Sequence, residues 1–155
     1  MSEAARDMQD LYRELVLDHS RNPRHFGPLE NATHTADGIN PLCGDKLKLY
    51  LRVNAAGEIE SSSFEGTGCA ISVASASLLT DAVTGLPVEQ AQACSAAVTD
   101  RLTTGDQATE LAANLKKLRA LDGVRHYPSR VKCATLAWQA LRSALNQDNT
   151  PATTE

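Results

Sequence analysis

The segment KLKLYLRV, residues 46–53, decides the fold of this chain. Its side chains alternate strictly, with aliphatic residues at odd positions and lysine, tyrosine or arginine at even positions. Because successive side chains of a β-strand point to opposite faces, this period of two places all the aliphatic groups on one face. An antiparallel strand with one buried and one solvated face has this pattern. The segment therefore predicts a half-buried strand.

The neighbouring segments predict the partners of this strand. Residues 54–58, NAAGE, are typical of a turn, and the chain then returns as a second strand from Glu58 to Glu65. A further edge strand is expected around Ala32 to Gly38. Together these segments predict a small antiparallel three-stranded sheet.

The rest of the chain has the periodicity of helices. We expect helices over Glu3–His19, Ile71–Thr84, Val88–Leu102 and Thr109–Leu121, and a last one opened by Tyr127-Pro128-Ser129. Asp106 is a candidate N-cap of the fourth helix. Strands early and helices late predict an α+β fold, with the helices packed on one face of the sheet.

Length and composition predict one cytoplasmic domain. A chain of 155 residues suits a single domain, which we expect over residues 1–146, followed by a disordered tail over residues 147–155. The net charge of -4 argues against a broad nucleic-acid surface. The N-terminal residues lack an apolar signal segment, and no run approaches the roughly 18 apolar residues of a membrane span. We therefore expect no nucleic-acid partner and no membrane contact.

The four cysteines are better explained by metal or sulfur chemistry than by disulfides, because cytosolic thiols are usually reduced. Cys43 precedes the first predicted strand pair, Cys69 follows a strand in a glycine-rich junction, and Cys133 lies early in the last helix. Thiols near helix N-termini favour the thiolate form, which lowers their pKa. Cys94 lies in mid-helix, where we expect a small buried hydrophobic residue.

The motif NPLCGD, residues 40–45, places a thiol and a carboxylate on either side of a glycine. Gly44 allows the backbone to turn both Cys43 and Asp45 to one side. With Cys69 and Cys133 they make four ligands of the kinds that zinc accepts. Two other interpretations stay open: a turn with Asp45 as a solvated hydrogen-bond acceptor, and a structural zinc site without a reactive thiol.

Basic residues flank the third candidate thiol. Four anionic ligands would outweigh the charge of a zinc ion, and Arg130 and Lys132 beside Cys133 could supply compensating donors. The histidines are scattered and show no ligand spacing, so each is expected to be a surface or capping residue: His19, His25, His34 and His126.

Three segments resemble the iron–sulfur assembly family related to IscU and the NifU N-terminal domain. They are NPLCGD at residues 40–45, FEGTGCAISVASASLLTDAV at 64–83 and YPSRVKCATLAWQAL at 127–141, in the order of the family. The resemblance extends from Leu11 to about Leu145. Within the family the chain resembles the SufU branch. A long segment separates the second and third motif cysteines, and Lys132 stands where the scaffold branch usually has histidine.

This resemblance implies a zinc-dependent sulfurtransferase. Such a protein takes persulfide sulfur from a SufS-type, pyridoxal-phosphate-dependent cysteine desulfurase, stimulates that enzyme, and passes the sulfur to downstream Suf assembly proteins. Carried over by motif, the zinc ligands are Cys43, Asp45, Cys69 and Cys133. Cys43 would also accept the persulfide, and Arg130 would steer the anionic sulfur. The alternative is a cluster scaffold that holds a transient iron–sulfur cluster on the same cysteines.

Overall fold

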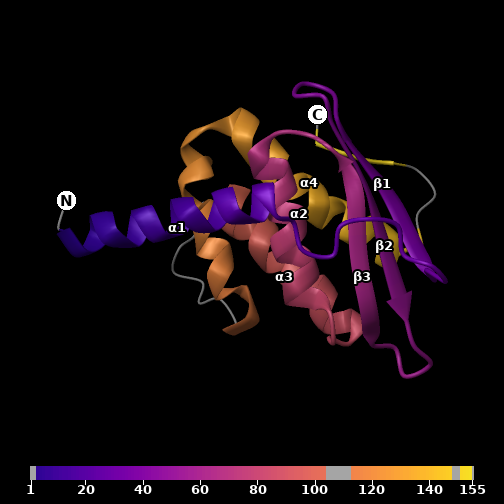
Figure 1. Ribbon diagram of the computed structural model, residues 1–155. Helices are drawn as coiled ribbons and strands as arrows, with labels where there is room; N and C mark the ends of the chain where they lie inside the picture. Colours follow the sequence, from indigo (N-terminus) through magenta and orange to yellow (C-terminus); the bar gives the residue numbers. More distant parts are fainter. Residues whose placement is uncertain (1–2, 104–112, 148–150, 155) are drawn as a thin grey trace.

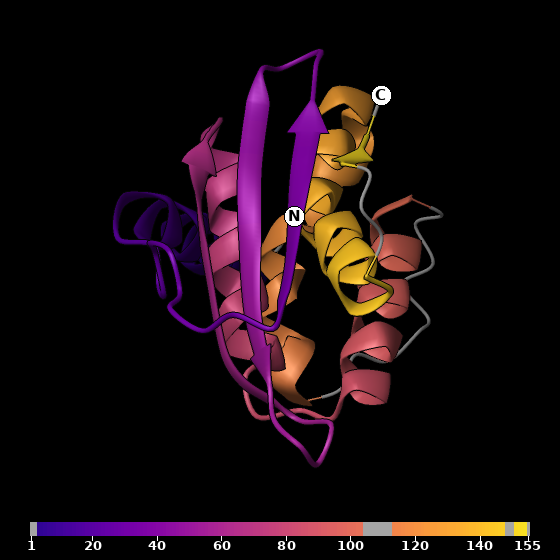
Figure 2. The same cartoon turned by 90° about the vertical axis from the view of Figure 1, so that its right-hand side faces the viewer.

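The computed structural model describes residues 3–103, 113–147 and 151–154. It confirms the α+β class: a sheet forms one side of the molecule and the helices lie against one of its faces (Figures 1 and 2). The sheet has the strand order β3-β2-β1-β4. Its strands are β1 (His34–Asn40), β2 (Asp45–Val53), β3 (Ile59–Thr67) and β4 (Ala152–Thr153).

The helices form layers behind this sheet. They are α1 (Glu3–Arg21), α2 (Ala70–Val83), α3 (Val88–Thr103), the 3-10 helix η1 (Ala113–His126) and α4 (Pro128–Leu145). Helices α2 and α4 contact the strands, while α1 packs on α2 and α3 packs on α4. The predicted start and end of α2 and the predicted start of α4 agree with the observed ones to within a residue or two.

The central strand β2 confirms the alternation that the sequence predicts. Leu49 and Leu51 are fully buried, whereas Lys46 and Lys48 are exposed on the opposite face. β2 pairs antiparallel with β1 and with β3 along its length. The helices therefore pack against the face of the sheet that carries the aliphatic side chains of β2.

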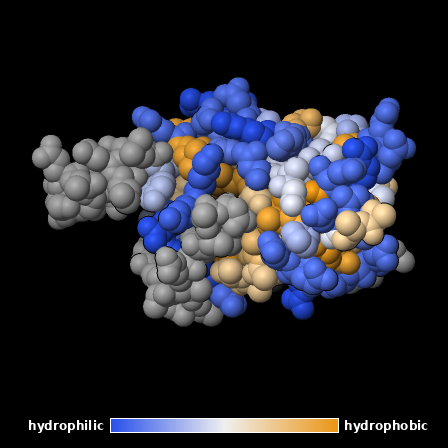
Figure 3. All heavy atoms as spheres, turned by 90° about the horizontal axis from the view of Figure 1, so that it is seen from below, coloured by the Kyte–Doolittle hydropathy of each residue, from blue (hydrophilic) through white to orange (hydrophobic). Residues whose placement is uncertain are grey.

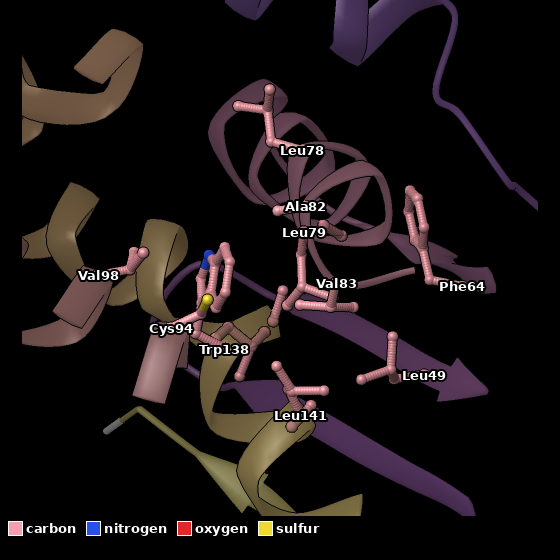
Figure 4. Close-up of a cluster of buried hydrophobic side chains, with 14 of the residues drawn as sticks. Leu49, Phe64, Leu78, Leu79, Ala82, Val83, Cys94, Val98, Trp138 and Leu141 are labelled. Atoms are coloured by element: carbon pink, nitrogen blue, oxygen red, sulfur yellow. The ribbon is translucent and has the colours of Figure 1, made fainter. Parts of the chain in front are cut away.

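Small side chains let α2 and α4 approach closely. Ser75 of α2 donates a hydrogen bond from its hydroxyl to the backbone oxygen of Ala134 at 2.5 Å, and it accepts one from Trp138 Nε1 at 3.2 Å. Trp138 is fully buried and belongs to a core built by strands and helices together. Figure 4 shows this cluster, with Cys94 of α3 in it. The expectation that Cys94 is a core residue is confirmed, since it is 8% exposed.

The sheet differs from the predicted one at one edge. The C-terminal residues Ala152–Thr153 form β4, which pairs in parallel with Gly38 and Ile39 of β1. The sheet is therefore mixed and four-stranded, β1 lies inside it, and the prediction of a disordered tail is wrong for these two residues. Two residues carry too little pattern to predict a strand, because only the pairing with β1 makes them one.

The single domain over residues 1–146 stays a prediction.

The fourth predicted helix differs as well. Its described part, Ala113–His126, has 3-10 geometry and continues past the predicted end at Leu121. The candidate N-cap Asp106 lies outside the described residues. Leu118, Leu121 and Val124 are buried at every third residue, which is the repeat of a 3-10 helix.

The expectation of a surface or capping role is wrong for His19, which is 1% exposed. The Ser77 hydroxyl accepts a hydrogen bond from the backbone N–H of Arg24 at 2.8 Å and lies 2.7 Å from His19 Nδ1. The hydroxyl and Nδ1 share one hydrogen bond, which the hydroxyl donates in one tautomer of the neutral ring and Nδ1 donates in the other. Burial, followed by the charge of Arg24, lowers the pKa of His19 below its ordinary value of 6.5.

Seen from below, hydrophilic side chains cover most of the described surface, with smaller hydrophobic areas between them (Figure 3). Among the described residues, no helix is both long enough and apolar enough to cross a membrane.

The buried His19 predicts a pH dependence of stability. Because the pKa of His19 is lower in the folded state than in the unfolded state, its contribution to stability is complete above about pH 6.5. This contribution is lost as the pH falls from 6.5 toward the folded-state pKa, since only the unfolded chain gains the proton in that range. His19→Asn retains an acceptor for Ser77 but does not titrate. We expect the free energy of unfolding, measured with urea, to fall less between pH 7.5 and pH 5.5 in His19→Asn than in the wild type. Equal falls would contradict the neutral, buried state of His19.

Candidate metal centre

The candidate ligands lie at the ends of different elements that meet at one end of the sheet. Cys43 lies in the turn between β1 and β2, and Asp45 is the first residue of β2. Cys69 is the N-cap of α2, and Cys133 lies in the first half of α4. The register pairs Lys46 with the last residue of β3, so the β1–β2 turn and the β3–α2 junction lie side by side.

Three of the four predicted ligands converge. The sulfur atoms of Cys43 and Cys133 and a carboxylate oxygen of Asp45 all lie within 4.8 Å of one another. Cys43 is exposed, whereas Asp45 and Cys133 are fully buried. Cys69 is not in this group of three, but its backbone N–H donates to Asp45 Oδ1 at 2.9 Å.

The Asp45 carboxylate is held from two sides. Its Oδ1 accepts the N–H of Cys69, and its Oδ2 accepts a hydrogen bond from Asn40 Nδ2 at 3.2 Å. The carboxylate also fills the space where residue 68 would carry a side chain, because a Cβ on Gly68 would lie 2.6 Å from Asp45 Oδ1. Gly44 has a φ of +73°, which glycine adopts without strain. The interpretation of Asp45 as a solvated turn residue is wrong, because this side chain is buried.

The Cys133 thiol has a raised pKa, opposite to the shift that its place near a helix N-terminus predicts. Burial raises it most, followed by hydrogen bonding with Asp45, Cys69 and Cys43. Cys133 lies five residues beyond Pro128, past the first turn of α4, and burial of the thiol outweighs the helix dipole there. A metal ion bound to this sulfur would favour its thiolate form.

Arg130 and Lys132 lie on the first turns of α4 beside this group. The Arg130 side chain is exposed and Lys132 is half-buried. Whether they act on a bound ion or a substrate stays a prediction. Asn40 was not predicted as a site residue, yet its Nδ2 lies 3.6 Å from Cys133 Sγ. The signal for it was its position at the start of the NPLCGD motif.

The donor set fits zinc. Thiolate sulfur and carboxylate oxygen are both accepted by this ion, and the backbone N–H of Cys69 bonds to Asp45 Oδ1. Cys69 as the fourth ligand stays a prediction. A purely oxygen-binding cation such as magnesium would not match two sulfur donors.

Comparison with known proteins gives several extended similarities. The family model described as NifU-like N terminal domain matches residues 11–134. The zinc-dependent sulfurtransferase SufU of Bacillus subtilis (strain 168) is 38% identical over 143 residues, which are 92% of this chain and 94% of that protein. The iron-sulfur cluster assembly scaffold protein IscU of Thermotoga maritima is 36% identical, over 91% of this chain and 96% of that protein.

A solved structure has a similar fold over most of this chain. The crystal structure of a putative iron-sulfur cluster assembly scaffold protein for the SUF system, from Fervidobacterium islandicum AW-1, matches with a TM-score of 0.74 and 30% identity. The match covers 85% of this chain and 94% of that one.

The close approach of Gly68 to Asp45 predicts that Gly68→Ala weakens metal binding. The added methyl group displaces the carboxylate, and we expect zinc affinity, measured by competition with a chelator, to fall at least about 10-fold. Gly123→Ala is the matched control, since a Cβ there meets nothing within 4 Å. Equal zinc affinities of Gly68→Ala and Gly123→Ala would contradict a role of Asp45 in the centre.

Proposed function

Because the chain belongs to the family of NifU-like N-terminal domains, we propose that it is a zinc-dependent sulfurtransferase of iron–sulfur cluster assembly. It takes persulfide sulfur from a SufS-type cysteine desulfurase in the cytoplasm, stimulates that enzyme, and delivers the sulfur to downstream Suf assembly proteins. The observation that carries this proposal is the convergence of two thiols and a carboxylate within 4.8 Å, with one of the thiols exposed.

The proposed zinc ligands are Cys43, Asp45, Cys69 and Cys133. When bound, zinc keeps its thiol ligands deprotonated and damps their reactivity. Asp45 and Cys133 are buried and hydrogen-bonded, so they serve as the fixed side of the centre. Cys43 lies exposed in the turn before Gly44, which makes it the thiol that a partner can reach.

The transfer step is an exchange between sulfur atoms. The Cys43 thiolate attacks the outer sulfur of the persulfide on the desulfurase, and a new sulfur–sulfur bond forms on Cys43. The sulfur–sulfur bond of the donor breaks at the same time, and the donor cysteine leaves as a thiolate with the bonding electron pair. No net oxidant is consumed in this step.

The turn that carries Cys43 supplies a docking surface for the partner. Leu42, the residue before Cys43, is 69% exposed although it is a large hydrophobic residue, and Tyr127 at the N-cap of α4 is 63% exposed. Exposed aromatic and aliphatic side chains next to a reactive group are typical anchors of protein interfaces. Arg130, exposed on the first turn of α4, adds a positive charge that attracts the anionic persulfide.

A cluster scaffold is the second candidate function. The similarity to the IscU scaffold of Thermotoga maritima favours it, since the identity is 36%. In a scaffold, the same cysteines would hold iron and inorganic sulfide as cargo. Lys132, in place of the histidine expected before Cys133 in scaffolds, favours sulfur transfer.

The proposal predicts the effect of this protein on desulfurase turnover, measured as alanine formed from cysteine. The zinc-loaded wild type should raise the rate, and Cys43→Ser should return it to that of the desulfurase alone, because the acceptor is lost. Cys94→Ala is the control, as Cys94 lies in the core outside the centre.

Stimulation by Cys43→Ser equal to that of the wild type would refute the acceptor role. No stimulation by the zinc-loaded wild type would favour the scaffold instead. In that case, anaerobic reconstitution with iron and sulfide should give a brown protein, whereas the sulfurtransferase stays colourless with zinc.

A further inference from the structure

Asn40 is the last residue of β1, and its side chain is fully buried against the metal centre. Its Nδ2 lies 3.2 Å from Asp45 Oδ2 and 3.6 Å from Cys133 Sγ. Its backbone oxygen accepts the N–H of Gly44 at 2.9 Å, so the same residue closes the turn that carries Cys43. We propose that Asn40 is a positioning residue: its carboxamide fixes two zinc ligands, so that the centre opens at Cys43.

The orientation of this carboxamide follows from the charges around it. A carboxamide has two N–H donors on one side and one oxygen on the other. Turned the other way, the oxygen of Asn40 would face the Asp45 carboxylate and the Cys133 sulfur, both of which are acceptors when ionised. Only the observed orientation gives attraction at both contacts.

The other end of the carboxamide has no favourable contact. Asn40 Oδ1 is buried and has no hydrogen-bond partner among the described residues. An unpaired buried polar group is destabilising, and an aliphatic side chain of similar size would avoid this cost. The hydrogen bonds that Nδ2 donates to the two ligands offset this cost, and they do so best when both ligands are negative.

These contacts make the centre asymmetric. Both oxygens of Asp45 accept hydrogen bonds, and Cys133 receives the Asn40 donor, so both side chains are held in place by hydrogen bonds. Cys43 is exposed, and no hydrogen bond from Asn40 reaches it among the contacts of the described residues. Loss of one ligand from a bound ion is therefore easiest at Cys43. This conclusion rests on the proposed function, because it identifies the thiol that leaves the zinc as the sulfur acceptor.

Cobalt substitution tests this inference on the whole chain. An N–H donor lowers the energy of the sulfur lone pair, so its loss should move the thiolate-to-cobalt charge-transfer band to longer wavelength. We expect this shift in Asn40→Leu, together with a fall of about 10- to 100-fold in zinc affinity. Asn40→Ala is the second variant, in case the leucine does not fit the site.

Asn54→Leu is the matched control. Asn54 Oδ1 accepts the N–H groups of Ala56 and Glu58 in the β2–β3 turn, so its loss should lower the melting temperature without changing the cobalt band. An unchanged band and affinity in the Asn40 variants would overturn the inference. A lower affinity with an unchanged band would also overturn it, since Asn40 would then act only through the turn.

The wild type separates this inference from the function on which it rests. If the wild type binds neither zinc nor cobalt, the metal centre is wrong and both proposals fail. If the wild type binds zinc and cobalt, and the Asn40 variants show the same affinity and the same cobalt band as the wild type, only the role of Asn40 is overturned.

Discussion

The buried carboxylate of Asp45 is the constraint on which the centre depends. Asp45 is the first residue of β2. Its carboxylate accepts hydrogen bonds from the backbone N–H of Cys69, the N-cap of α2, and from Nδ2 of Asn40, the last residue of β1. A buried carboxylate without such donors would be costly, so these elements must meet in one arrangement. The register of the sheet provides it, because Asn40 pairs with Asp45 and Lys46 with Thr67. A slip by one residue would turn Asp45 to the other face.

Local patterns were sufficient to predict most of the fold. The alternation over residues 46–53 identified the central strand, and Pro128 marked a helix start. Strand β4 could not be predicted, because its two residues are a strand only by pairing with β1. The burial of His19 was also missed, since it depends on where the end of α1 meets α2.

The candidate site was predicted in composition but not in its electrostatics. The structure brings Cys43, Asp45 and Cys133 together, while Cys69 stands next to them at the start of α2. The raised pKa of Cys133 could not be read from its place near a helix N-terminus, because burial and neighbouring acceptors are tertiary effects. Asn40 was missed for the same reason: its donor is significant only because Asp45 and Cys133 lie within its reach.

A centre with a buried, hydrogen-bonded side and an exposed thiol suits a protein that accepts sulfur from a partner. We propose that four side chains of this centre, from different elements of the fold, bind one zinc ion. X-ray absorption at the zinc edge of the loaded protein tests this most directly. The account predicts one zinc with three sulfur neighbours at about 2.3 Å and one oxygen neighbour. Nitrogen neighbours, or fewer than three sulfurs, would contradict it.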